Sequence, residues 1–126
     1  MPPTRFSERE LDVMAVLWRL ESGTVAEVRE ALADTVGYTG VLKLLQILEE
    51  KGAVRHESEG RAYRYFPVVT PEEAGGPALQ RLVDTIFQGS AEMLLARLVH
   101  TTDPSAAELA RMRDLLNELE DTEVDA

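Results

Sequence analysis

Apolar residues recur at helical spacing in the first fifty positions of the chain, and each run begins with residues typical of a helix start. In "FSERELDVMAVLWRLESG", Ser7 and Glu10 have the spacing of a capping box. Phe6 and Leu11 flank this start as a hydrophobic staple. Apolar positions then follow at intervals of three and four residues, which predicts a first helix that we expect Gly23 to end.

Two more helices are expected before the pattern changes. Thr24 and Glu27 repeat the capping-box spacing at the start of the second helix. The third lies in "GYTGVLKLLQILEEKG", where Thr39 is expected to cap the helix and Gly52 to end it. Its apolar stripe consists of Val41, Leu44, Leu45 and Leu48.

The next segment, "AVRHESEGRAYRYFPV", has the alternation of β-strands. β-Branched and aromatic residues, above all Tyr63 and Tyr65, alternate on both sides of Glu59-Gly60, which predicts a β-hairpin. Three short helices followed by a hairpin is the order of a winged helix-turn-helix. Because strands and helices do not alternate along the chain, a parallel-sheet enzyme core is excluded.

Beyond residue 70 the pattern is helical. "TPEE" is another helix start, and the run of two glycines and a proline at 75–77 is expected to interrupt that helix as a hinge. Three apolar stripes follow. Gly89-Ser90 separates the first from the second, and Ser105 is expected to cap the helix that carries the third. Three short amphipathic helices bury little surface by themselves, so we expect a second copy of the chain to cover them. The residues expected at this dimer interface are Leu82, Ile86, Phe87, Leu94, Leu95, Leu98, Leu109, Met112, Leu115, Leu116 and Leu119.

The net charge of -10 changes this picture mainly at the C-terminal end. Residues 1–70 hold nine Lys and Arg against eleven Asp and Glu, a net of -2, whereas residues 71–126 hold four against twelve, a net of -8. Nucleic-acid binding usually depends on positive charge. Only the nearly neutral N-terminal part is therefore expected to present a basic face. The acidic tail "EDTEVDA" is expected to be solvated and frayed.

Several kinds of chemistry are excluded by what the sequence lacks. Without cysteine there is no disulfide, thiolate metal site or cysteine nucleophile. His56 and His100 lack metal-ligand spacing, and no nucleophile elbow or phosphate loop occurs, so we expect no metal, no cofactor and no enzyme activity. No apolar run approaches the roughly 18 residues that cross a bilayer, and no signal-peptide pattern occurs. We therefore expect a cytoplasmic protein without membrane insertion.

The third helix offers an exposed face suited to DNA. Thr39, Lys43 and Gln46 follow one another at i, i+4 and i+7, opposite the apolar stripe. Lys43 suits a phosphate or guanine, Gln46 an adenine edge, and the Thr39 hydroxyl a phosphate. The Tyr38 hydroxyl also suits a phosphate, with packing of its ring against the fold as the alternative.

The hairpin is the more basic of the two elements. Arg61 and Arg64 lie beside its tip and Arg55 lies on the opposite strand. Such arginines can follow the phosphates or enter the minor groove. The alternative is cross-strand pairing with Glu57 and Glu59, which contributes little at a surface.

Four motifs together resemble the penicillinase-repressor family, the BlaI/MecI/CopY group of bacterial transcriptional repressors. They are "TVAEVREAL", "YTGVLKLLQILEEKGAV", "GRAYRYFPV" and "FQGS", within a resemblance from about Phe6 to Leu119. The resemblance implies a mainly α (α+β) homodimer with a winged-helix DNA-binding domain at 1–70 and a helical dimerisation region at 71–126. It also implies binding to double-stranded DNA at a palindromic operator and repression of the downstream genes.

The same resemblance implies two routes of release from the operator. In resistance members a membrane-bound zinc metalloprotease sensor triggers cleavage in the dimerisation region, and the corresponding point here is near Arg97-Leu98. In copper-responsive members a cysteine-rich tail binds metal, a route that this cysteine-free chain lacks. The asparagine-aromatic pair found at the cleavage point of the resistance repressors is absent from "LLARLVH".

The recognition helix also departs from the family pattern. Thr39-Gly40 replaces two adjacent threonines, and Ile47 stands where an arginine is frequent. Lys43 is then the one basic residue of this helix before its acidic end. These departures and the acidic net charge leave a second function open, in which the winged-helix dimer binds a protein partner and has little or no sequence-specific DNA binding.

Overall fold

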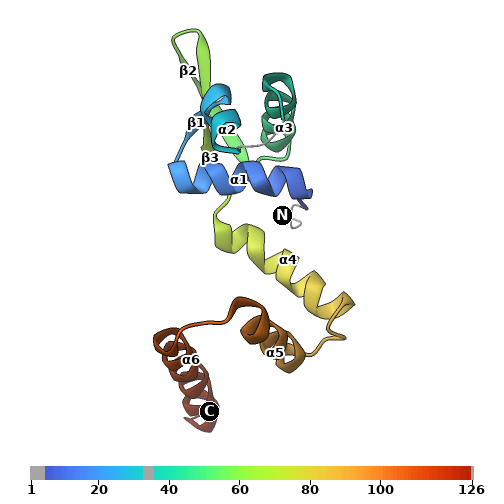
Figure 1. Ribbon diagram of the computed structural model, residues 1–126, viewed down its shortest axis with the longest axis vertical. Helices are drawn as coiled ribbons and strands as arrows, with labels where there is room; N and C mark the ends of the chain where they lie inside the picture. The colour runs from blue at the N-terminus through green and yellow to red at the C-terminus, as the bar shows by residue number, and fades with distance from the viewer. Residues whose placement is uncertain (1–4, 33–35, 126) are drawn as a thin grey trace. The chain divides into compact units, whose positions relative to one another are not determined.

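The structure, a computed structural model, describes residues 5–32 and 36–125 (Figure 1). Its order of three short helices, a hairpin and further helices agrees with the predicted winged-helix arrangement. The elements are α1 (Glu8–Leu20), β1 (Gly23–Thr24), α2 (Val25–Leu32), α3 (Tyr38–Glu50), β2 (Val54–Glu59), β3 (Ala62–Pro67), α4 (Pro71–Thr85), α5 (Ala91–Thr102) and α6 (Ala106–Asp125).

The chain divides into two compact units, the first ending at Arg81 and the second beginning at Leu82. The expected boundary after residue 70 lies before α4, whereas the division lies inside α4. The start of α4 belongs to the first unit because Ala74 is buried, with 7% of its surface exposed.

In the first unit, α1 packs against α2 and α3, and α2 packs against α3. Figure 1 shows the β2–β3 hairpin projecting from these helices away from α1. Burial of each large apolar side chain contributes about 1.5–3 kcal/mol, so the inward faces of the helices and the base of the hairpin hold this unit together. The largest fully buried side chains are Tyr65, Met14, Leu17, Leu45, Leu48, Val13, Val28 and Val41.

The start of α1 is the predicted capping box. The Glu10 backbone N–H donates to Ser7 Oγ at 3.1 Å, and the Ser7 N–H donates to Glu10 Oε1 at 3.2 Å. Burial raises the pKa of Glu10, but its hydrogen bonds to Lys51 and Ser7 outweigh that effect, so this pKa lies below its ordinary value. The Lys51–Glu10 ion pair thus joins the end of α3 to the start of α1.

The expectation that Gly23 ends the first helix is wrong. The helix ends at Leu20, where Glu21 takes the left-handed conformation with φ 73°. Gly23 instead forms β1 and pairs with Tyr65 of β3. A Cβ at Gly23 would come within 3.1 Å of Val28 Cγ2, so packing against α2, rather than helix termination, explains this glycine.

The predicted hairpin is confirmed, and β1 extends it to a three-stranded antiparallel sheet in the order β1-β3-β2. Glu59 pairs with Ala62, so Gly60 and Arg61 form the turn, one residue later than expected. Gly60 has φ 62°, a conformation that favours glycine. Tyr65 is buried, whereas Tyr63, further out along the same face, is half exposed.

The expected break at 75–77 is wrong, since α4 is continuous through Pro77. Thr70 and Glu73 form a capping box at its start, with N–H to side-chain distances of 3.2 and 3.1 Å. Proline removes one backbone donor, at a cost of about 3 kcal/mol inside a helix. The cap and the burial of Ala74 hold the first turn in spite of that cost.

In the second unit, α6 begins at Ser105, the predicted cap, and α5 begins at Ser90, where the sequence predicted a break. Ser90 Oγ accepts from the Met93 N–H and Ser105 Oγ from the Glu108 N–H, each at 3.1 Å. The expectation of a frayed tail is wrong for residues 120–125, since α6 extends to Asp125. No glycine or proline follows Ser105 that would end this helix earlier.

Candidate nucleic-acid interface

The outward face of α3 carries the three predicted contact residues. Thr39, Lys43 and Gln46 are all exposed, whereas Val41 and Leu45 on the opposite face are completely buried. Within residues 5–32 and 36–125, no hydrogen bond or ion pair engages the side chain of Lys43. The helix therefore presents one cation and two hydrogen-bonding side chains to solvent, with their full donor capacity available.

The N-terminus of α3 differs from the prediction. The helix starts at Tyr38 with Gly37 as its N-cap, so Thr39 lies inside the first turn and does not cap it. Gly37 has no side chain to accept from the first backbone N–H groups, and the first turn contains no acidic residue. These N–H groups and the helix dipole can face an anion. The half-exposed Tyr38 side chain lies at the same end.

Gly40 has a packing explanation. A Cβ at this position would lie 3.1 Å from Val36 Cγ1, tighter than ordinary contact. A larger residue would press on the segment that leads into α3. The departure from the two-threonine pattern of the family thus coincides with close packing at the entry to α3.

The tip of the hairpin presents Arg61. This residue lies in the two-residue turn next to Gly60, and it is exposed. Among the residues that the structure describes, none forms a hydrogen bond or ion pair with its side chain. Arg61 is therefore available to an external anion.

Arg55 on β2 is exposed but partly engaged. Its guanidinium pairs with Glu57 of the same strand at 2.9 Å and lies over the Phe66 ring, 4.4 Å from the centroid. An exposed pair of this kind contributes at most about 1 kcal/mol. Arg55 can consequently exchange Glu57 for a phosphate at little cost, while the Phe66 ring supports the guanidinium.

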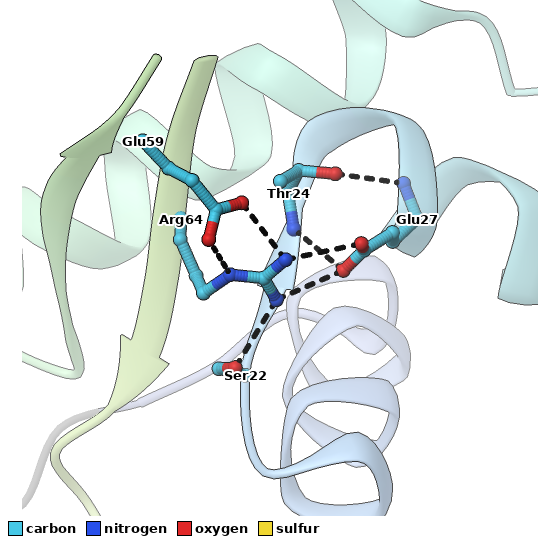
Figure 2. Close-up of polar contacts among 5 residues, drawn as sticks. All are labelled: Ser22, Thr24, Glu27, Glu59 and Arg64. Atoms are coloured by element: carbon cyan, nitrogen blue, oxygen red, sulfur yellow. Dashed lines mark hydrogen bonds and ion pairs between the residues drawn. The ribbon is translucent and has the colours of Figure 1, made fainter.

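Arg64 is the most strongly bound of the hairpin arginines. Figure 2 shows its guanidinium between Glu59 of β2 and Glu27 of α2. The distances are 3.0 and 2.9 Å to the Glu59 oxygens, 3.0 and 3.1 Å to those of Glu27, and 3.2 Å to Ser22 Oγ. We call Arg64, Glu59, Glu27 and Ser22 the Arg64 cluster. Hydrogen bonds to Glu59 and Glu27 raise the pKa of Arg64.

Glu27 has two roles at once. It closes the predicted capping box of α2, accepting from the Thr24 N–H at 3.2 Å, while its own N–H donates to Thr24 Oγ1 at 3.2 Å (Figure 2). The sequence revealed this box but not the contact with Arg64, because the two partners are 37 residues apart and only the folded sheet brings them together.

A histidine links the hairpin to the end of α3. His56 Nδ1 lies 2.6 Å from Glu49 Oε2, and its ring packs against Tyr63 and Tyr65 with centroid distances of 4.4 and 5.6 Å. Burial raises the pKa of Tyr65, and the nearby charge of Glu49 adds to the rise. The carboxylate of Glu49 is thus engaged by His56 of the β2–β3 hairpin.

Among the described residues, no group of three potential metal ligands occurs.

The predicted dimer residues lie on one unit, the second. Part of each side chain is covered there, but α5 has no buried residue. Ile86 is 63% exposed, Leu115 60% and Leu119 59%. A groove of about 540 Å³ runs between α5 and α6, lined mainly by Leu95, Leu98, Met112, Leu115 and Leu116. No described helix is both long and apolar enough to cross a membrane.

Helices α1 to α3 with the attached hairpin define a winged-helix protein. The penicillinase repressor family model matches residues 6–118. The chain belongs to this family, whose members are transcriptional repressors rather than enzymes.

Individual relatives support this family assignment. Transcriptional regulator BlaI of Mycobacterium tuberculosis is 37% identical over 122 residues, which cover 93% of this chain and 86% of the relative. The penicillinase repressor of Bacillus licheniformis is 24% identical over 116 residues, 90% of this chain and 91% of the relative.

Solved structures support the same fold. The solution structure of the DNA binding domain of the repressor BlaI is 32% identical, with a TM-score of 0.51 over 56% of this chain and 89% of that chain. A crystal structure of a mutant MarR from E. coli has a TM-score of 0.51 at 19% identity, covering 90% of this chain and 77% of that chain. This second likeness concerns the fold alone.

Proposed function

We propose that the chain is a cytoplasmic transcriptional repressor that binds a palindromic operator as a homodimer. Its recognition helix α3 enters the major groove, and the wing, the hairpin of β2 and β3, lies along the neighbouring backbone. The observation that carries this proposal is the outward face of α3. There the side chains of Thr39, Lys43 and Gln46 have no hydrogen-bond or ion-pair partner within the described chain. Membership of a repressor family supports it.

The contact residues divide by the part of DNA they suit. Gln46 and Lys43 lie in the body of α3, where side chains reach base edges. Tyr38 and Thr39 lie at its N-terminus and suit a phosphate. Because α3 offers only one cation, Lys43, to DNA, phosphate binding also depends on the arginines of the wing. These are Arg61 at the turn and Arg55 on β2.

The dimer supplies the second half-site. The apolar side chains of α5 and α6 remain exposed on one protomer, and a second copy of the same chain would cover them symmetrically. Two recognition helices would then contact half-sites about 34 Å apart, or a multiple of that spacing. The acidic second unit weakens nonspecific attraction to DNA.

Fluorescence anisotropy tests this function. The purified protein is titrated against the duplex upstream of its own gene and against a scrambled duplex of equal composition. We expect tight, dimer-stoichiometric binding to the native duplex, weakened roughly tenfold by Lys43→Ala and by Arg61→Ala. Arg113→Ala on α6 removes the same charge from the second unit and serves as the matched control.

Equal, weak binding to both duplexes would contradict the proposal. So would Lys43→Ala and Arg61→Ala variants that bind like the control. Either result would favour the winged-helix dimer as a module that binds a protein partner.

For release from the operator we propose cleavage of α5 near Arg97-Leu98, downstream of a membrane-bound sensor protease. Both side chains are exposed. Since a protease binds an extended segment, α5 must open locally before cleavage. Mass spectrometry of the protein from cells in which the regulated genes are induced should find a fragment ending at Arg97. An intact chain together with derepressed genes would exclude this route.

A further inference from the structure

The Arg64 cluster leaves the guanidinium of Arg64 with no N–H for a further acceptor. An arginine side chain carries five N–H groups. Two are donated to Glu59, two to Glu27 and one to Ser22 (Figure 2). A DNA phosphate could reach this guanidinium only by displacing one of the two carboxylates, each of which it holds through two hydrogen bonds.

The charge of the cluster also disfavours a phosphate. One guanidinium and two carboxylates sum to -1 at neutral pH. Hydrogen bonds from Arg64 and from the Thr24 N–H lower the pKa of Glu27, so that it stays ionised well below neutral pH. An approaching phosphate would therefore meet net negative charge.

The position of the cluster indicates what it does instead. Strand β1 supports β3 only at two pairs, Gly23 with Tyr65 and Thr24 with Arg64. Beyond Arg64 the hairpin is a two-stranded ribbon, an arrangement that is marginally stable alone. The side chain of Arg64 ties both strands of this ribbon to α2, because it binds Glu59 beside the turn and Glu27 on the helix.

We propose that Arg64 is a positioning residue, which fixes the outer wing against the start of α2 and so sets where Arg61 meets DNA. This replaces the direct DNA contact expected for Arg64, and it rests on the proposed DNA binding for its effect on affinity. Arg61 is next to the last pair of the ribbon, Glu59 with Ala62. Any rotation of the ribbon about its base therefore moves Arg61 most.

The two roles of Arg64 predict opposite effects of neutralising Glu27. Glu27→Gln keeps an oxygen that can accept from the Thr24 N–H, so the capping box of α2 is retained. If Arg64 bound phosphate, the substitution would free its guanidinium and remove a repelling charge, and DNA affinity would rise. If Arg64 positions the wing, affinity falls. The matched control is Glu30→Gln, which removes the same charge from an exposed position of α2.

Anisotropy with the native duplex should show binding by Glu27→Gln about fivefold weaker than by Glu30→Gln. Arg64→Lys should weaken binding similarly, because an ammonium cannot hold two carboxylates through paired hydrogen bonds. Arg61→Ala should lose less affinity in the Glu27→Gln background than in the wild type, since Arg61 acts through the fixed wing. A purely stabilising role for Arg64 would leave that coupling at zero.

Hydrogen exchange of the free protein tests the positioning role without DNA. Amides of residues 58–63 should exchange faster in Glu27→Gln than in Glu30→Gln, while those of α3 should not change. Unchanged exchange, or tighter binding by Glu27→Gln, would overturn the proposal. Faster exchange in a protein that binds no duplex would instead overturn the proposed function and leave the positioning role standing.

Discussion

The two units of the chain use apolar residues in opposite ways. The first unit encloses them, and Leu17, Leu45 and Leu48 have no exposed surface. The second unit leaves them open, with Leu115 and Leu119 more than half exposed and no buried residue in α5. The first unit therefore has a core of its own. The second exposes apolar side chains, and a partner that covered them would stabilise it.

The largest effect should follow from damage to the enclosed core. Leu45→Ala should lower the free energy of unfolding of the first unit by about 2–5 kcal/mol, because it removes buried methyl groups and leaves a cavity. Urea titration followed by the fluorescence of Trp18 measures this. The same substitution at the exposed Leu115 should change that transition far less. Equal losses at the two positions would remove the contrast between the units.

Dimerisation should be the most sensitive property of the second unit. Leu116→Glu places a charge in the apolar groove and should weaken self-association roughly 100-fold. Asn117→Glu, on the next and already polar position, adds the same charge and should leave the dimer intact. Sedimentation velocity over a range of concentrations distinguishes the two variants. A Leu116→Glu protein that remains dimeric would mean that another surface joins the protomers.

The features that the sequence revealed are those with short-range causes. The predicted capping boxes at Ser7 and Thr24 each connect residues three positions apart and are confirmed, as is the helix start predicted at Thr70. The outward face of α3 followed from helical periodicity, and the positions of Thr39 and Lys43 on it are exposed as expected.

The features that the sequence did not reveal depend on distant partners. For Arg64 the sequence offered either a DNA contact or cross-strand pairing, and the structure shows pairing with Glu59. The second partner, Glu27, is 37 residues away, and nothing near Arg64 indicates this contact. The break expected around Pro77 ignored the burial of Ala74, which holds the start of α4 to the first unit. Strand β1 is only two residues long, too short for any pattern.

A moderate effect on the free energy of unfolding is expected at the segment that leads from the hairpin into α4. The Trp18 indole N–H donates to the Val69 carbonyl at 2.8 Å, so the segment leading into α4 is held to α1. Trp18→Phe removes this bond and leaves the carbonyl without that partner, with an expected loss of about 1 kcal/mol. Circular dichroism during urea unfolding measures it. No loss would place the end of the stable unit before Val69.

The smallest effect should appear in the pH dependence of the first unit. Glu10 and Glu27 have pKa values below the ordinary 4.5, so the unfolded chain takes up protons more readily than the folded one. Their contribution is therefore fully present above about pH 4.5 and is lost as the pH falls through the folded-state values. Urea midpoints from about pH 6 down to about pH 3 should decrease accordingly.

Glu10→Gln isolates the buried part of that dependence. Glutamine can keep the capping box with Ser7, but it cannot form the ion pair with Lys51. Its midpoint should be lower than the wild-type value near neutral pH, and it should approach that value in acid. Glu8→Gln, exposed in the same first turn, is the control and should follow the wild-type curve. If the two variants behaved alike, the Lys51–Glu10 pair would contribute nothing to the first unit, and apolar burial alone would distinguish it from the second.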